Sequence, residues 1–394
     1  MQPAKYFLLR SLSLVLVLVF SAGASLTYAG PREQAKQIHD RLAGVPPSDT
    51  VIDSMAAKIS GGDGIGAAYE AMENQAFYNT TLREFASPWT NREQSVYVDL
   101  NDSIATVIGM IRDDVPFDQL LHEDIVYVGS GNATGIPYSQ TDNDHYIDLQ
   151  ANRIDLSDTA NLVRQRQSEL PGSPLGIEQT AGIMTTRGFS EAYYVAGTNR
   201  SPLRFATLNF LCKDMEDFRD ITAHPDRIRQ DVARSPGGDS NIFLNDCLSC
   251  HAGLDGLAGA YAFYDFDEDT QQLEYTAGSV QPKFLKDANT FPFGYETVDD
   301  SWINYWRDGP NAFVGWDGSV PGMGSGVKSL GIELAQSRQF AECQVKQVFE
   351  KVCYRTPNGQ ADNETIESIA TNFETNGRRM KQVFAETAVY CMGD

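Results

Sequence analysis

The sequence has little positive charge and no long hydrophobic segment. It contains 31 Lys and Arg residues against 53 Asp and Glu, which gives a formal net charge of −22. Nucleic-acid phosphates need a basic surface, so this balance argues against a nucleic-acid-binding protein. The main apolar run, Leu12 to Phe20, is about nine residues, well short of the ~20 that a bilayer-spanning helix needs. We therefore expect no membrane span once an N-terminal signal is removed.

Familiar enzyme signatures and sequence repeats are also absent. We find no Ser/His/Asp arrangement, no phosphate-binding glycine loop and no zinc-type cluster of Cys and His. No internal repeat or low-complexity tract is present, which argues against a solenoid or a disordered chain. With 42% hydrophobic and 21% charged residues, the composition is that of a globular protein.

The N-terminus has the three-part layout of a secretory signal. Lys5 and Arg10 precede the apolar run, and small residues with cleavage sites after Ala24 or Ala29 follow it. We predict a signal peptide over residues 1–29 and a location in the bacterial envelope, either periplasmic or secreted. An uncleaved membrane anchor is the alternative interpretation.

Helical patterns dominate the remaining sequence, so the predicted fold class is mainly α. Helices are expected within residues 31–89, 100–112, 177–196 and 202–211. In the last seventy residues, apolar side chains recur at i, i+3, i+4 and i+7 in three stretches. Breaks at residues 356–359 and 376–377 separate these stretches. By contrast, residues 126–158 are dense in Gly, Asn, Asp, Thr and Ser, and we expect a loop there with short strands at most. Residues 270–322 are rich in Gly, Pro, Asp and aromatics, which indicates an irregular loop region, with a surface insertion as the alternative.

One motif carries recognisable chemistry. Cys247, Cys250 and His251 have the Cys-x-x-Cys-His spacing by which c-type haem is attached. Two thiols one helical turn apart can both form thioethers with the haem vinyl groups, and the next imidazole can then reach the iron. We predict one covalent haem c here, with His251 as an iron ligand. A Cys247–Cys250 disulfide or a thioredoxin-like redox pair is the alternative, although no βαβ pattern surrounds the motif.

Four further cysteines, an even number in an exported chain, suggest two disulfides. If residues 343–353 form one helix, Cys343 and Cys353 are about 15 Å apart, too far for a bridge. Two pairings remain. We favour Cys353–Cys391, which would tie two C-terminal helices, together with Cys212–Cys343. Buried free thiols are the alternative.

Beyond the motif, the sequence resembles a known group of proteins. Residues 251–257 read His-Ala-Gly-Leu-Asp-Gly-Leu, and the stretch ends at Asp265. This resembles the haem segment of the planctomycete-type cytochrome c proteins, in which the motif precedes a hydrophobic-Asp-Pro-Leu run that closes on Phe-Asp. Residues 116–128, 181–204 and 337–345 are similar to the group's N-terminal, middle and C-terminal domains. The resemblance therefore covers roughly residue 100 to the end, and it implies haem binding and redox work.

The chain departs from that group at three points. Gly256 stands where the group usually has Pro, and Tyr264 replaces the Phe before Asp265. The carbohydrate-binding-like and second cytochrome modules of the longest relatives are missing. We expect a cytochrome c-like haem segment embedded between helical domains. The predicted boundaries are residues 1–29 for the signal peptide, 30–176 for an N-terminal helical domain, 177–322 for the haem domain and 323–394 for a C-terminal helical domain.

Three functions agree with these features. The first is an exported mono-haem electron carrier, whose acidic surface would suit a basic redox partner, plain solubility being the other explanation of the charge. The alternative is a haem-dependent oxidoreductase or peroxidase-like enzyme with an open distal iron site; its catalytic residues stay unknown. The third is a structural haem in a protein that binds a partner.

The choice between carrier and enzyme depends on the sixth iron ligand, because six-coordinate iron passes electrons and an open site can do chemistry. Met323 follows the motif in a glycine-flanked loop, where the backbone can approach the haem closely, and we predict it as this ligand. Met184 and His145 are the next candidates. Met184 lies in helical sequence where a core residue is expected, and His145 lies in a polar loop where a surface histidine is expected.

A second string of polar residues has a simpler interpretation. Asp265–Asp269 alternates carboxylates as calcium loops do, but it lacks the glycine and the distal Glu of an EF-hand. We predict a solvated acidic turn.

Overall fold

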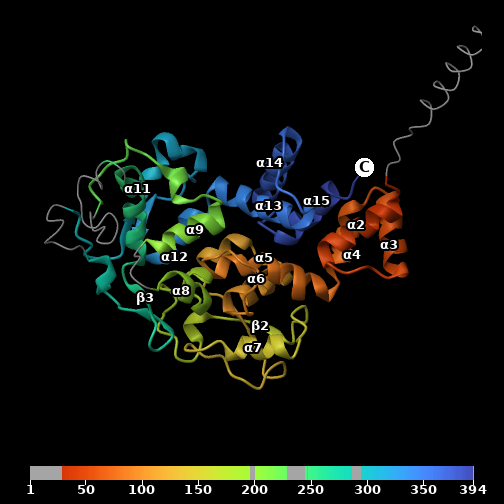
Figure 1. Ribbon diagram of the computed structural model, residues 1–394, viewed down its shortest axis with the longest axis horizontal. Helices are drawn as coiled ribbons and strands as arrows, with labels where there is room; N and C mark the ends of the chain where they lie inside the picture. Colours follow the sequence, from red (N-terminus) through yellow and green to blue (C-terminus); the bar gives the residue numbers. More distant parts are fainter. Residues whose placement is uncertain (1–28, 196–199, 229–244, 246, 286–293, 394) are drawn as a thin grey trace, which may run out of the picture.

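The computed structural model describes residues 29–195, 200–228, 245, 247–285 and 294–393. These residues are mainly helical, which confirms the predicted fold class (Figure 1). Residues 1–28 of the predicted signal peptide lie outside the described residues. The α-helices of the described part are α2 (Pro31–Ala43), α3 (Asp49–Ser60), α4 (Gly64–Met72), α5 (Arg83–Ala86), α6 (Asp102–Arg112), α7 (Asp144–Ala151), α8 (Arg187–Tyr193), α9 (Ser201–Leu211), α11 (Leu248–Ala258), α12 (Gly326–Ala335), α13 (Arg338–Cys353), α14 (Gln360–Thr375) and α15 (Met380–Tyr390).

Side-chain caps explain where several of these helices begin. Ser48, Asn101, Thr186 and Ser337 each precede a helix in extended backbone and accept a hydrogen bond from an N–H of its first turn. Such a cap satisfies one of the four amides that a helix N-terminus leaves without a partner. At the other end, Gly44 closes α2 with a φ of 70°, a conformation that favours glycine.

The strands form three small antiparallel sheets of two strands each. They are β1 (Val126–Gly129) with β2 (Leu162–Gln165), β3 (Tyr264–Asp267) with β4 (Gln272–Tyr275), and β5 (Ser301–Ile303) with β6 (Met323–Ser325). An isolated two-stranded sheet is only marginally stable in water. Here β1 packs on α6, β4 on α8 and β5 on α11, so each sheet gains packing contacts with a helix.

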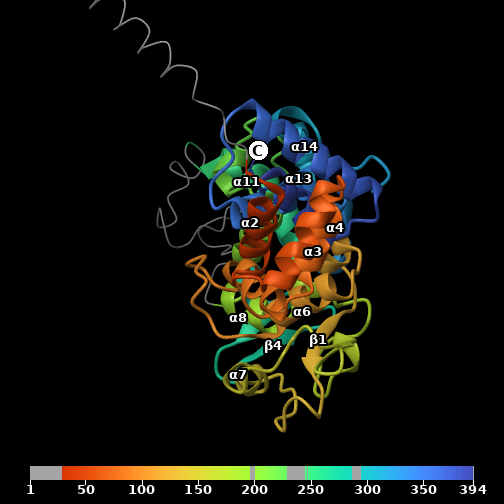
Figure 2. The same cartoon turned by 90° about the vertical axis from the view of Figure 1, so that its right-hand side faces the viewer.

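One hydrophobic core connects the described elements. Its buried side chains extend from Ala35 in α2 to Ala388 in α15. Helix α15 packs on α4 and α13, and α9 packs on both α13 and α11, so segments far apart in sequence share this core. In Figure 1, α11 lies towards one end of the long axis and α2–α4 towards the other. Figure 2 looks from the latter end. In this view, α13 and α14 lie above α6, and α7 lies below it. The core contains residues from both sides of positions 176 and 322. The domain boundaries predicted at these positions stay predictions.

Three sequence-based expectations for secondary structure need correction. The predicted loop over residues 126–158 contains α7, because Tyr146 and Leu149 are buried and anchor one helical face. The predicted helix over residues 177–196 is reduced to a 3-10 turn at Gly182–Thr185 and to α8. Helix α12 was not anticipated. The predicted helices over residues 100–112 and 202–211 and the three C-terminal helices are confirmed.

The favoured disulfide pairing is also confirmed. Cys353 and Cys391 join the ends of α13 and α15, with 5.6 Å between their Cα atoms. Cys212, directly after α9, joins Cys343 in α13 with 5.3 Å between their Cα atoms. Both separations are ordinary for a disulfide. Among the helices of the described ranges, none combines the length and the apolar character that crossing a membrane requires.

Candidate haem-binding site

The Cys-x-x-Cys-His motif occupies the first turn of α11. Cys247 is the N-cap residue, and Cys250 and His251 follow within the helix. Both cysteines are half-buried, and neither belongs to the Cys212–Cys343 or the Cys353–Cys391 disulfide. The predicted geometry of two thiols one helical turn apart, followed by an imidazole, is therefore present.

A buried carboxylate holds the motif's histidine. Nδ1 of His251 is 3.1 Å from Oδ1 of Asp255, one helical turn later, and the Asp255 side chain is completely buried. A carboxylate on Nδ1 fixes the ring orientation and directs Nε2 as the nitrogen for a metal. This arrangement is the common one for histidines that ligate metals.

Arg200 compensates the buried charge of Asp255. From the N-cap position of α9, its Nε and Nη2 donate to Oδ1 and Oδ2 of Asp255 at 2.5 and 3.0 Å. Burial raises the pKa of the Asp255 carboxyl, but the charges of Arg200 and His251 outweigh this and hold that pKa well below its usual range. The carboxylate is therefore ionised where it meets the imidazole.

The sequence analysis named neither Asp255 nor Arg200 as a site residue. A signal for Asp255 did exist, since an ionisable residue four positions after the motif histidine interrupts an otherwise apolar helix. No comparable signal exists for Arg200, because only the packing of α9 against α11 brings it to the site.

Three glycines explain how closely α11 is packed. Gly253, Gly256 and Gly259 recur every three residues, and a Cβ there would meet Trp306 Nε1 at 1.8 Å, Ile303 O at 2.7 Å and Ser301 O at 2.4 Å. Such distances leave no room for a side chain, so β5 and Trp306 lie directly against the helix backbone. This contact explains why position 256 is a glycine.

A small apolar cluster accompanies the motif and is separate from the main core. Ile228 and Ala252 are buried in it, and Ala223, Cys247 and Leu248 pack around them. The apolar residues that follow the motif belong to the main core: Leu254, Leu257, Ala258, Ala260 and Tyr261. The apolar surface beside Cys247 is built partly by Ala223 and Ile228, which were not predicted as site residues from the sequence.

Met323, the predicted sixth ligand, does not lie in a flexible loop. It begins β6, pairs with Ile303 of β5, and keeps 55% of its surface exposed. The loop prediction was wrong because pairing with β5 orders these residues, and Gly322, with a φ of 72°, makes the turn that admits them. Its role as a ligand stays a prediction.

The two next candidates are engaged elsewhere. Met184 is fully buried, as expected, and its Sδ accepts a hydrogen bond from the Tyr261 hydroxyl at 3.5 Å. His145 is buried in α7, so its expected surface position was wrong. Its Nδ1 contacts the carbonyl of Ile136 at 2.6 Å, and its Nε2 accepts from the Gly129 amide at 2.8 Å. With both nitrogens in hydrogen bonds, His145 is a structural residue.

The acidic string is a strand followed by a turn. Residues up to Asp267 belong to β3, and Asp267 Oδ1 accepts from the amides of Asp269 and Thr270. Asp265 is paired with Lys283 at 2.5 Å. Within the part of the chain that the structure describes, no group of three or more His, Cys, Asp or Glu side chains could hold a metal ion. A haem iron needs no such group, because the porphyrin supplies four of its ligands.

No family model, curated protein or solved structure matches this chain. The resemblance to the planctomycete-type cytochrome c proteins therefore stays a prediction, and the function has to be argued from the residues themselves.

Proposed function

We propose that this protein is an exported mono-haem c-type cytochrome that transfers electrons; Cys247 and Cys250 would hold the haem c covalently, and His251 would be a ligand of its iron. The observation that carries the proposal is the motif at the start of α11, with its two cysteines outside the disulfides and its histidine held by the buried Asp255. With Nδ1 engaged by Asp255, Nε2 is the nitrogen left for the iron, which supports His251 as its ligand.

The bound haem would supply an iron that alternates between two oxidation states. The position of the haem and the orientation of its ligand would be set by the chain's own residues. Cys247 and Cys250 set the position of the group, and Asp255 sets the orientation and basicity of His251. Arg200, paired to Asp255 through two hydrogen bonds, keeps that carboxylate ionised inside the protein. Ala223 and Ile228 add apolar surface beside Cys247.

The location and the partner follow from charge and redox compartment. Disulfides persist in oxidising compartments such as the bacterial periplasm, and c-type haem is attached outside the cytoplasm, so we place the protein in the periplasm or outside the cell. The formal charge of −22 would steer encounters with a basic redox protein.

The test is an absorption spectrum of oxidised and reduced protein produced in cells that attach c-type haem. We expect haem that survives denaturation in the wild type and is lost in the double variant Cys247→Ala/Cys250→Ala. Ser249→Ala is the matched control, since it changes the same turn and keeps both thiols; it should retain full covalent haem. Haem that stays attached in the double cysteine variant would refute the proposal.

A further inference from the structure

A short segment before the motif lies against the first turn of α11. The Asp220 amide donates to the carbonyl of Ser249, between the two motif cysteines, at 2.8 Å. Ala223 and Ile228 belong to the small apolar cluster that contains Cys247. The residue between them that matters chemically is His224, which directly follows Ala223. The backbone that carries this histidine is therefore held beside the cysteines.

His224 is oriented in the same way as the motif histidine. Its Nδ1 is 3.0 Å from Oδ1 of Asp226, compared with 3.1 Å between His251 and Asp255. The Tyr305 hydroxyl donates to the same oxygen of Asp226 at 2.6 Å and fixes the carboxylate. With this carboxylate oxygen 3.0 Å from Nδ1, that nitrogen is the one engaged with Asp226. Nε2 is then the nitrogen available for a metal.

The other histidines of the chain are arranged differently. Nδ1 of His39 contacts the carbonyl of Val45, and His145 uses both nitrogens. His122 approaches Asp118 through Nε2, the nitrogen that a ligand would need, at 3.9 Å. Of the five histidines in the sequence, His224 and His251 alone have Nδ1 on a carboxylate in the described residues.

The methionines offer one rival. Met55, Met72, Met110, Met184 and Met380 are buried in the main core, and Met215 and Met392 pack against it. Met323 is exposed, but it pairs with Ile303, whose carbonyl meets α11 at Gly256, more than a helical turn beyond the motif. His224 instead belongs to the segment that contacts Ser249 and Ala252. Its side chain is 71% exposed, so it can move to a ligand without disturbing the core.

We propose that His224 is the second axial ligand of the haem iron, trans to His251, in place of Met323. This inference rests on the proposed function. Two imidazoles make the iron six-coordinate and low-spin, with a lower reduction potential than a His/Met pair. Such an iron has no open position for peroxide or another substrate, which favours the electron carrier over the haem enzyme.

The test compares three holoproteins: wild type, His224→Ala and Met323→Ala. Covalent haem is measured after denaturation, and spin state by absorption and electron paramagnetic resonance of the oxidised protein. We expect a low-spin wild type without the weak sulfur–iron charge-transfer band at the red end of the spectrum. His224→Ala should keep its covalent haem and become high-spin, and added imidazole should restore the low-spin spectrum. Met323→Ala should resemble the wild type.

A second variant guards against an indirect effect of the alanine. In His224→Met, a thioether replaces the imidazole, so the charge-transfer band should appear and the reduction potential should rise. A low-spin His224→Ala protein, a high-spin wild type, or loss of a charge-transfer band in Met323→Ala would each overturn the assignment. Absence of covalent haem in the wild type would instead refute the proposed function, and the two failures are distinguishable because haem content and spin state are measured separately.

Discussion

Two helices of this protein carry cysteines, and they pack in different ways. Helix α13 presses large apolar side chains, among them Phe340, Val348 and Phe349, into the main core, and its Cys343 and Cys353 are both buried in disulfides. Helix α11 meets its neighbours through three glycines, and Cys247 and Cys250 stay half-buried beside a small cluster. The comparison teaches that the bridged cysteines lie on a helix packed by large apolar side chains, and that the half-buried motif cysteines lie at a helix packed through glycines.

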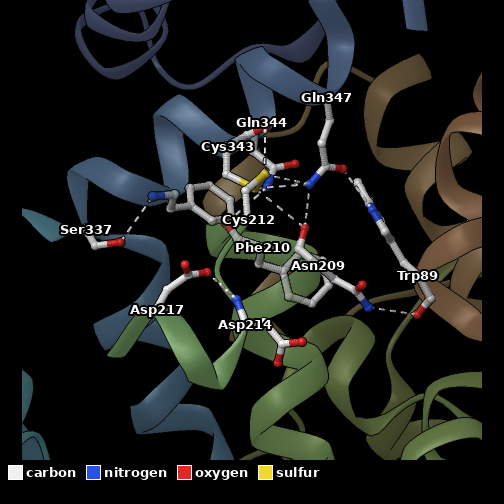
Figure 3. Close-up of a disulfide and its surroundings, with 11 residues drawn as sticks. Trp89, Asn209, Phe210, Cys212, Asp214, Asp217, Ser337, Cys343, Gln344 and Gln347 are labelled. Carbon is white, nitrogen blue, oxygen red and sulfur yellow. Dashed lines mark hydrogen bonds between the residues drawn. A yellow bond between two sulfur atoms is a disulfide. The ribbon is translucent and has the colours of Figure 1, made fainter. Parts of the chain in front are cut away.

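The surroundings of the Cys212–Cys343 bridge illustrate the first kind of packing (Figure 3). The Gln347 amide donates to the carbonyl of Asn209 at 2.7 Å and contacts Cys343 Sγ at 3.0 Å. Its oxygen accepts from Trp89 Nε1 at 2.9 Å. These polar contacts connect the Cys212–Cys343 disulfide to Trp89 and Asn209, so the bridge is tied into the surrounding structure.

The largest expected effect on stability comes from removing the Cys212–Cys343 disulfide. Cys212 and Cys343 are 131 residues apart, so the double variant Cys212→Ala/Cys343→Ala should lose about 5 kcal/mol of unfolding free energy by the loop-entropy relation. Cys353→Ala/Cys391→Ala, with a separation of 38, should lose about 4 kcal/mol. Both are measured by chemical denaturation. Covalent haem should survive in the folded protein of each variant. Two or more titratable thiols in the unfolded, oxidised wild type would contradict the assignment.

The next effect concerns the buried charge of α11. Asp255→Ala removes the carboxylate that compensates Arg200, and breaking a buried ion pair in this way costs about 3–5 kcal/mol. The spectrum of the holoprotein should change as well, because His251 loses the acceptor for Nδ1. Glu169→Ala is the control: its pair with Arg166 is exposed on both sides and should contribute less than about 1 kcal/mol. Equal costs in the two variants would mean that Asp255 is not the anchor described.

A smaller effect tests the glycine contacts of α11. In Gly253→Ala the new Cβ would lie 1.8 Å from Nε1 of Trp306, which is buried and stacked on Phe218 at 4.1 Å between ring centroids. Overpacking of this kind costs about 1–3 kcal/mol, more than the ~1 kcal/mol that alanine gains over glycine in a helix. Gly131→Ala, with nothing within 4 Å of the added Cβ, should be neutral. Thermal unfolding followed by tryptophan fluorescence gives both values, and a stabilised Gly253→Ala would show that the helix is not closely covered.

The smallest expected effect is the pH dependence of stability that comes from a buried histidine, His145. Burial lowers the pKa of His145 below its ordinary value, so the folded protein keeps this ring neutral at pH values where the unfolded chain is protonated. The contribution of His145 is therefore complete above the ordinary pKa of about 6.5 and is lost as the pH falls below it.

Urea unfolding at pH 7.5 and pH 5.5 measures this dependence. In His145→Gln the fall in stability between the two pH values should be smaller than in the wild type. It should not vanish, because burial also lowers the pKa of His39. An unchanged difference between the two pH values would show that His145 is not the buried neutral ring described here.

Local sequence patterns determined much of what the structure contains. The mainly α class and the three C-terminal helices follow from apolar spacing, which depends only on residues three or four positions apart. For the disulfides, the length of one helix excluded only the Cys343–Cys353 pairing, since these two residues on the same helix cannot reach each other. The choice between the two remaining pairings was settled by the tertiary structure. The motif at Cys247, Cys250 and His251 is likewise local, and its chemistry is written in five consecutive residues.

Contacts between distant segments were decided only by the tertiary structure. Helix α7 forms in sequence that reads as loop, because burial of Tyr146 and Leu149 outweighs the weak local preference. Met323 is drawn into β6 by Ile303, and His145 is buried by Gly129 and Ile136. At the candidate site, Arg200 reaches Asp255 across 55 residues, and Ala223 and Ile228 come to lie beside Cys247. Local sequence patterns cannot predict these contacts, because each contact depends on how whole helices pack against one another.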